Sequence, residues 1–209
     1  MTAATLGPRF GDAVQYAAIV HGGQDRKGSP TPYLGHLLGV AALVLEDGGD
    51  EDEAIAALLH DAAEDHGGVR RLADIEARYG LRVCNIVHRC SDTLIDPKPP
   101  WTTRKGRFIQ RTRDAMADPG ADRGLLRVIL ADKLHNLRAI EMECLRVGDA
   151  VYDRFNVPKV HTLAFYNEMS RTLSKTHPEH GKLGPMAKQL KRLVKEMGGR
   201  QLRLHWAED

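Results

Sequence analysis

Two adjacent polar residues, His60 and Asp61, interrupt an apolar stretch that reads AIAALLHDAAED. A carboxylate in such surroundings is costly unless it is paired or bound to a metal. Residues three and four positions apart share one side of a helix, so Glu64 follows both on the same side, and Asp65 lies four residues after Asp61. This arrangement offers metal ligands together with a base for the bound water, which is what metal-assisted hydrolysis needs.

The structural alternative is that His60 and Asp61 are polar residues at the edge of a core, satisfied by hydrogen bonds. Two more isolated polar residues argue against it, because His36 lies in LGHLLGVAALVL and Asp132 lies in LLRVILADKLHNL. Four ligand-type side chains in three apolar segments indicate a metal centre. A mixed imidazole and carboxylate set suits Mn²⁺, Fe²⁺, Mg²⁺ or Zn²⁺.

The composition excludes several other classes of protein. The 209 residues, 42% hydrophobic and 28% charged, fit one globular domain. A net charge of +2 and only 5% aromatic residues argue against nucleic acid as a partner. We find no membrane-spanning run and no secretory leader, and so expect a cytoplasmic protein without a membrane partner. The three cysteines match no paired pattern, which indicates reduced thiols.

Helical periodicity dominates the chain, and alternating strand patterns are scarce. Glycine and proline separate the helical segments, which predicts an all-α bundle with essentially no sheet. The expected helices cover residues 10–21, 34–45, 50–65, 69–79, 81–95, 102–117, 122–147, 158–176 and 184–197.

An ordered set of motifs gives the chain a family resemblance over about residues 10–170. The motifs are HGGQDRK at 21–27, Pro32 with Tyr33, His36, HDAAED at 60–65 and LADKLHNL at 130–137. In these the chain resembles the HD-domain metal-dependent phosphohydrolases, and among them the hydrolase domain of RelA/SpoT-type alarmone enzymes, including small single-domain hydrolases. The resemblance implies an HD-domain helical bundle, with residues 1–209 as one domain that carries a C-terminal helical extension.

The resemblance also implies roles for particular residues. The metal ligands it implies are His36, His60, Asp61 and Asp132, and the catalytic acids are Glu64 and Asp65, the positions already singled out by their chemistry. It favours Mn²⁺, one ion per chain. Arg26 and Lys27 would contact the base and phosphates of a nucleotide, whereas without the resemblance they read as a solvated loop pair. Asn136 could offer its amide to a ribose hydroxyl or to the attacking water.

Two departures from the family pattern affect the substrate side. One extra residue separates Arg26 from His36, and CSDTLIDPKPPW stands where alarmone enzymes usually read like VTKL. We therefore do not assume guanine as the base. The segment PKPPWTTRK could clamp phosphate or form a plain solvated basic helix. The residues Phe155, Asn156, Lys159 and Tyr166 resemble positions that could wall the nucleotide, although helix packing is the stronger reading for the two aromatic ones.

The function expected first is removal of pyrophosphate from the 3′ position of an alarmone nucleotide, such as guanosine 3′,5′-bis(diphosphate) or an adenosine analogue. The alternative is an HD-type phosphatase acting on nucleoside monophosphates or another phosphoester. A third hypothesis is a nucleotide-binding module without activity, which the complete set of ligands and acids disfavours. The sequence leaves the base, the number of 5′-phosphates and the oligomeric state open.

Overall fold

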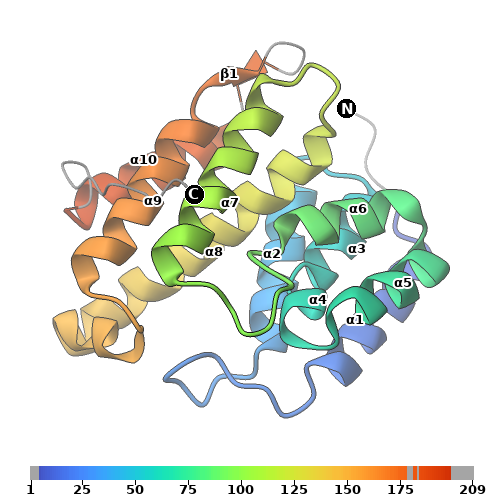
Figure 1. Ribbon diagram of the computed structural model, residues 1–209, viewed down its shortest axis with the longest axis horizontal. Helices are drawn as coiled ribbons and strands as arrows, with labels where there is room; N and C mark the ends of the chain where they lie inside the picture. Colours follow the sequence, from blue (N-terminus) through green and yellow to red (C-terminus); the bar gives the residue numbers. More distant parts are fainter. Residues whose placement is uncertain (1–4, 178–180, 183, 199–209) are drawn as a thin grey trace. The chain divides into compact units, whose positions relative to one another are not determined.

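The computed structural model describes residues 5–177, 181–182 and 184–198, and within them α-helices dominate (Figure 1). The elements are α1 (Pro8–Val20), α2 (Leu34–Glu46), α3 (Glu51–Leu59), α4 (Ala62–Asp65), α5 (Gly68–Tyr79), α6 (Leu81–Cys90), α7 (Trp101–Ala117), α8 (Arg123–Val147), a 3₁₀ helix η1 (Gly148–Arg154), α9 (Lys159–Leu173), β1 (Thr176–His177), β2 (Gly181–Lys182) and α10 (Pro185–Glu196). The two-residue strands form one antiparallel pair. The all-α prediction is confirmed.

One expected helix, residues 50–65, is wrong as a continuous element. The structure ends α3 at Leu59 and begins α4 at Ala62, so that His60 and Asp61 form the turn between them. The ring Nδ1 of His60 donates to the carbonyl of Ala57 at 2.8 Å. That side-chain bond occupies a carbonyl of the last turn of α3, where it competes with the main-chain ladder.

Two other expected helices also end earlier than their patterns suggested. The helix expected over 81–95 stops at Cys90, where Ser91 takes an extended conformation. The one expected over 158–176 stops at Leu173. By contrast, α7 and α8 begin and end within one residue of the expected bounds.

The chain divides into two compact units. The first comprises residues 1–98 and 122–132, and the second comprises residues 99–121 and 133–209. The helix α8 continues from the first unit into the second between Asp132 and Lys133. The single domain over residues 1–209 stays a prediction.

The first unit is built around α3. All six residues from Ala54 to Leu59 are fully buried, because α3 packs against α1, α2 and α6. A helix enclosed on every side must be apolar on every side, and the sequence AIAALL meets that condition. The apolar helix α2 packs along α3, and α5 packs on α6. The turn that carries His60 and Asp61 therefore leaves the most buried helix of this unit.

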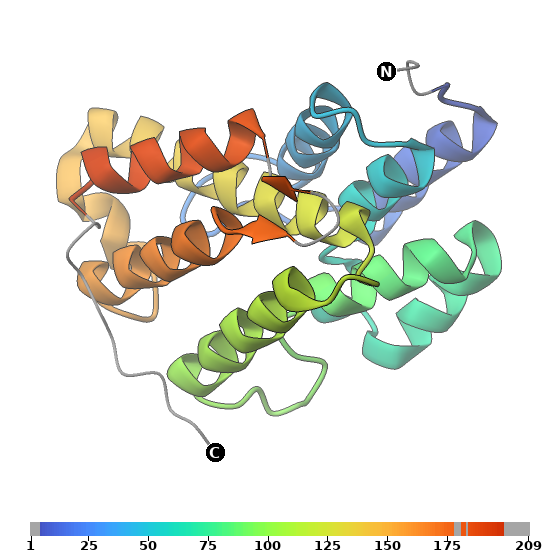
Figure 2. The same ribbon diagram turned by 90° about the horizontal axis from the view of Figure 1, so that it is seen from above.

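The second unit contains α7, α9, α10, the later part of α8 and the short strands. In it α9 (orange) lies between α10 (red) and α7 (green), and it packs on both (Figure 2). Of the helices in the described ranges, none combines the length and the apolar character that crossing a membrane requires.

A buried ion cluster ties α3 to α8 within the first unit. Glu53 and Arg127, at 5% and 7% exposure, form a direct ion pair. Arg127 also binds Asp47 at 3.0 Å, and Arg82 binds the second oxygen of Glu53 at 3.0 Å. The absence of a side chain at Gly124 makes room for this acid, since a Cβ there would lie 2.6 Å from Cγ of Glu53.

We predict that Arg127→Ala destabilises the protein by about 3 kcal/mol, because it removes the positive charge that pairs with the buried carboxylates of Glu53 and Asp47. Chemical unfolding at equilibrium measures the change. The matched control is Arg192→Ala, which removes an exposed arginine from an i,i+4 pair with Glu196 and should cost less than about 0.5 kcal/mol. Equal losses in the two variants would contradict the structural role of this cluster.

Candidate metal centre

Three side chains of the first unit converge from separate elements. His36 lies in the first turn of α2, His60 follows the end of α3, and Asp132 lies in α8. One ligand atom of each lies within 4.8 Å of the other two, and all three residues are buried. The apolar helices that surround them leave these polar groups to face one another.

The distances within the cluster fit a shared cation. His36 Nε2 and His60 Nε2 lie 3.3 and 3.5 Å from Oδ1 of Asp132. Donor atoms that each bind one small divalent ion at about 2 Å are separated by at most about 4 Å. Asp61, the fourth predicted ligand, places Oδ2 3.0 Å from Nε2 of His60 and 3.9 Å from Nε2 of His36. The structure therefore brings all four residues together.

Neighbouring groups orient the imidazoles and the carboxylate. The carbonyl of Ala57 accepts from Nδ1–H of His60, so a neutral ring turns the lone pair of Nε2 toward the cluster. That atom is buried and has no hydrogen bond of ordinary geometry within the described residues. The hydroxyl of Tyr33 donates to Oδ2 of Asp61 at 2.5 Å, and its ring meets the ring of His36 edge-on at 5.4 Å. The unprotonated Nε2 of His60, with the carboxylates of Asp61 and Asp132 beside it, is a suitable ligand for a cation.

Burial and neighbouring charges act in opposite directions on the titratable groups of the cluster. Burial alone would lower the pKa of His60, but the neighbouring carboxylates of Asp61 and Asp132 raise it well above the usual value. Burial would likewise raise the pKa of Asp61, but His60 outweighs it and lowers that pKa. Burial lowers the pKa of His36 despite the nearby Asp132. An imidazole must be unprotonated to bind a metal, so a divalent cation would compete with the proton at His60.

The two predicted acids lie in α4, next to the cluster along the chain. Glu64 accepts from the backbone N–H of Asp92 at 2.7 Å through Oε2, and from Nζ of Lys98 at 2.9 Å through Oε1. Asp65 accepts through Oδ2 from the amide of Gln24 at 2.9 Å. Each acid is thus held by a residue distant in sequence.

The loop between α1 and α2 carries Arg26 and Lys27. Its two sides are joined by backbone hydrogen bonds from Arg26 to Thr31 at 2.8 Å and from Tyr33 to Gln24 at 2.8 Å. Arg26 is half-buried and Lys27 is exposed. The loop that presents the predicted substrate contacts is therefore braced.

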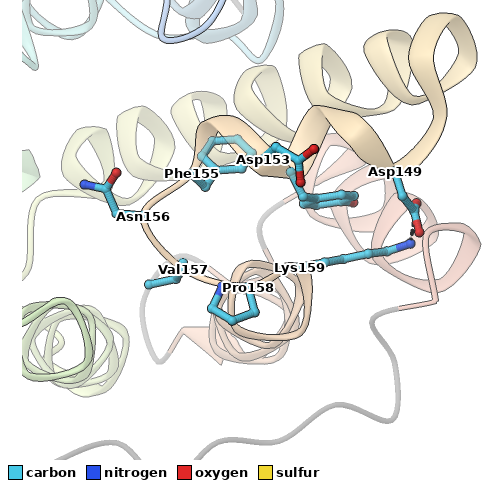
Figure 3. Close-up of a pocket in the computed structure, with 8 residues that line it drawn as sticks. Asp149, Asp153, Phe155, Asn156, Val157, Pro158 and Lys159 are labelled. Atoms are coloured by element: carbon cyan, nitrogen blue, oxygen red, sulfur yellow. Dashed lines mark hydrogen bonds and ion pairs between the residues drawn. The ribbon is translucent and has the colours of Figure 1, made fainter.

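The other predicted nucleotide contacts fall in the second unit. Asn136 is half-buried and lies four residues beyond Asp132 along α8. Phe155, Asn156 and Lys159 line an open cavity of about 510 Å³, in which Lys159 pairs with Asp149 at 2.6 Å (Figure 3). Tyr166 is buried against Phe165, with ring centroids 5.6 Å apart, and it does not line that cavity.

The basic segment 98–105 separates into individual contacts. Lys98 pairs with Glu64 in the first unit. In the second unit Arg104 donates to the carbonyl of Pro99 at 3.0 Å, and Lys105 lies over the ring of Phe165. The phosphate clamp considered for this segment stays a prediction.

Sequence reasoning did not assign roles to the groups that hold the acids. Gln24 lies inside the HGGQDRK motif, but the sequence does not indicate that its amide meets Asp65. The backbone N–H of Asp92 leaves no sequence signal at all. The partners were missed because they come from other elements, and only the fold brings them to Glu64 and Asp65.

The fold and the site together define the class of protein. The HD-domain family matches residues 13–155, and the chain belongs to that family. Two similar relatives carry the name guanosine-3′,5′-bis(diphosphate) 3′-pyrophosphohydrolase MESH1. The one from Xenopus tropicalis is 37% identical over 134 residues, or 62% of this chain and 68% of that protein. The one from Homo sapiens is 35% identical over 130 residues, or 61% of this chain and 66% of that protein.

Other similar proteins are longer or have been solved as structures. GTP pyrophosphokinase rsh of Brucella suis is 31% identical over 145 residues, which is 68% of this chain but 18% of that protein. A solved metazoan ortholog of SpoT that hydrolyzes ppGpp has a TM-score of 0.67 at 24% identity, over 96% of this chain and 99% of that chain. The Listeria monocytogenes protein lmo0812 has a TM-score of 0.62 at 26% identity, over 78% of this chain and 97% of that chain. These likenesses show a shared fold.

We predict that Asp132→Ala abolishes stoichiometric binding of a divalent metal, because it removes the carboxylate that faces both imidazoles. Elemental analysis after loading with Mn²⁺ and gel filtration measures the metal content. The control Asp74→Ala removes a half-buried aspartate of α5 that pairs with Arg78 away from the cluster, and should leave the content unchanged. A full equivalent of metal in the Asp132 variant, with its helical signal intact, would refute the assignment.

Proposed function

We propose that this protein is a metal-dependent hydrolase that removes pyrophosphate from the 3′ position of guanosine 3′,5′-bis(diphosphate) or an adenosine analogue. The observation that carries the proposal is the buried cluster of His36, His60 and Asp132. The acidic pair Glu64 and Asp65 follows His60 by four and five positions. Relatives that are 35–37% identical are named for this reaction. Water would cleave the bond between the 3′ oxygen and phosphorus, leaving a 3′-hydroxyl and free pyrophosphate.

We assign the metal to His36, His60, Asp61 and Asp132, with Mn²⁺ as the ion, one per chain. A divalent ion held there would supply Lewis-acid polarisation of the diphosphate and would make a water molecule easier to deprotonate. Imidazole and carboxylate ligands suit Mn²⁺, and family resemblance favours it over the other divalent ions. Tyr33 supports the proposed ligand Asp61, since burial, together with the charge of Asp61 and the hydrogen bond to it, raises the pKa of Tyr33 and keeps its hydroxyl a donor.

Glu64 and Asp65 are the proposed acids of the chemical step. Neither is assigned to the metal, which leaves carboxylate oxygens to take the proton of the attacking water. The contacts from Asp92 and Lys98 to Glu64, and from Gln24 to Asp65, hold both carboxylates in defined orientations. A base held in place by its surroundings is what efficient proton transfer requires.

Arg26, Lys27 and Asn136 are the proposed substrate contacts. The two cations belong to the braced loop that ends at Tyr33, one residue before α2 and its ligand His36. Cations in this position suit the several negative charges of a bis(diphosphate). The amide of Asn136 suits a ribose hydroxyl, because it both donates and accepts.

We propose the cytoplasm as the place of action, with a nucleotide as the partner and no nucleic acid or membrane. The thiols of Cys84 and Cys90 support the proposed compartment, since they are buried and unbridged, as expected in a reducing environment. The modest net charge of +2 supports a small-molecule partner over a polymer.

A substrate panel tests the proposal. With Mn²⁺ present, the protein should release pyrophosphate from guanosine or adenosine 3′,5′-bis(diphosphate) and leave nucleotides that carry only 5′-phosphates intact. Anion-exchange chromatography resolves the products. Release of orthophosphate from nucleoside monophosphates would replace this function with the HD-type phosphatase, and tight binding without turnover would support an inactive binding module.

We predict that Glu64→Gln lowers kcat by about 10²- to 10⁴-fold, the range for loss of a general base, because the amide keeps the shape but loses the basic oxygen. Metal content and nucleotide binding should persist. Pyrophosphate release under saturating Mn²⁺ gives kcat, with Glu76→Gln on α5 as the control. Near wild-type turnover in the Glu64 variant would exclude the proposed role.

We predict that Arg26→Ala and Lys27→Ala each raise KM several-fold while the melting temperature changes little, since both lie in a polar loop. Initial rates over a range of substrate concentrations measure the effect. Lys188→Ala, on α10, is the control. If KM stays the same in both loop variants, these cations have no part in binding.

A further inference from the structure

Gln24 is the centre of a hydrogen-bond network beside the candidate metal centre. Its amide nitrogen lies 2.9 Å from Oδ2 of Asp65, and its carbonyl oxygen lies 2.6 Å from Nδ1 of His21 and 2.7 Å from Nε2 of His66. One side chain thus joins the end of α1 to α4 and the residue that follows it. Neither the family match nor the names of the relatives assign a role to this glutamine.

The chemistry of the partners permits one orientation of the amide. An ionised Asp65 only accepts hydrogen bonds, so the NH₂ group of Gln24 must face it. The carbonyl oxygen then faces both rings and can only accept, so each ring must present an N–H. His21 is therefore protonated on Nδ1 and His66 on Nε2.

The surroundings of His21 hold this arrangement in place. The ring is 3% exposed and stacks on the ring of Tyr33 at 5.3 Å, while the ring of His66 meets it edge-on at 4.9 Å. Burial lowers the pKa of His21, which favours the neutral ring. Its Nε2 is buried with no hydrogen-bond partner among the described residues, as expected for the nitrogen that carries no proton.

The backbone of Gln24 is fixed as well. Its N–H donates to the carbonyl of His21 at 3.0 Å, and its own carbonyl accepts from the N–H of Tyr33 at 2.8 Å. Asp65, in contrast, is an exposed residue at the end of the four-residue helix α4. Ala62 and Ala63 anchor α4 in the core, but the side chain of Asp65 itself is exposed, so the contact from Gln24 helps to fix its orientation.

We propose that Gln24 is a positioning residue for Asp65, aligned by His21 and His66, which holds Oδ2 of the acid and leaves Oδ1 for the proton of the attacking water. This role rests on the proposed function, because it gives Asp65 a part in the chemical step. The alignment itself is a property of the side chains and is testable without turnover. The two parts of the proposal therefore have separate experiments.

The first experiment reads the tautomers of the two histidines by ¹⁵N–¹H NMR at pH 7 on the full chain. In the wild type, His21 should be protonated on Nδ1 and His66 on Nε2. Gln24→Ala should remove the preference of at least one ring, while Gln15→Ala, which removes an exposed glutamine from α1, should leave both unchanged. A wild-type His21 protonated on Nε2, or rings unaffected by Gln24→Ala, would overturn the alignment.

The second experiment is a double-mutant cycle on pyrophosphate release, with Gln24→Ala, Asp65→Asn and the combined variant. Gln24→Ala should lower kcat roughly 10- to 100-fold with KM within about twofold of the wild type, since misplacing a catalytic group by about 1 Å has effects of this size. In the Asp65→Asn background the same change should alter kcat less than about twofold. If the loss of kcat in the combined variant equals the product of the losses in the two single variants, Gln24 does not act through Asp65, and the positioning role fails.

A conservative variant separates positioning from folding. Gln24→Glu keeps the length and an accepting oxygen for both rings but has no N–H for Asp65, so it should lose kcat like Gln24→Ala while the melting temperature stays within a few degrees of the wild type. Wild-type turnover in Gln24→Glu would overturn the role. A wild-type protein that releases no pyrophosphate at all would refute the proposed function, and the tautomer measurement would still decide the alignment.

Discussion

Two imidazoles and a carboxylate share a small buried volume in the first unit, and this constraint organises much of what surrounds them. Polar groups removed from water must find partners, and here the partners are one another. The apolar helix α2, the turn after the enclosed helix α3, and the first half of α8 each contribute one of the three. The same desolvation that makes the arrangement costly also strengthens its attraction for a cation. The surrounding apolar packing is therefore part of the site.

The positions of the candidate ligands could be predicted because each contrasts with its neighbours. His36, His60 and Asp132 are polar residues in segments that are otherwise apolar, and such a contrast survives without knowledge of the fold. The helical character of their segments was equally plain from the 3.6-residue periodicity. Sequence alone therefore yielded the all-α fold and the residues of the cluster.

The details that the sequence did not predict depend on contacts between distant segments. At the break after Leu59 the side chain of His60 bonds to the main chain, and the periodicity of the sequence does not indicate such a bond. The pairing of Lys98 with Glu64 joins residues 34 positions apart. Lys98 in the linear sequence looked like a free cation of a basic segment. The charge pattern of a sequence shows which residues can form ion pairs, but the partner of each residue depends on the fold.

The close approach of Gly124 to Glu53 has a consequence for how the chain can evolve. Any side chain at position 124 would collide with the acid that Arg82 and Arg127 both bind. A descendant that gains even a methyl group there must first shorten residue 53, and two arginines would then lose their shared carboxylate. The order of the two substitutions therefore matters. A side chain at position 124 would be tolerated after residue 53 has become shorter, and would be severely destabilising before that. Substitutions at positions 53 and 124 therefore depend on one another, although the two positions lie 71 apart in the sequence.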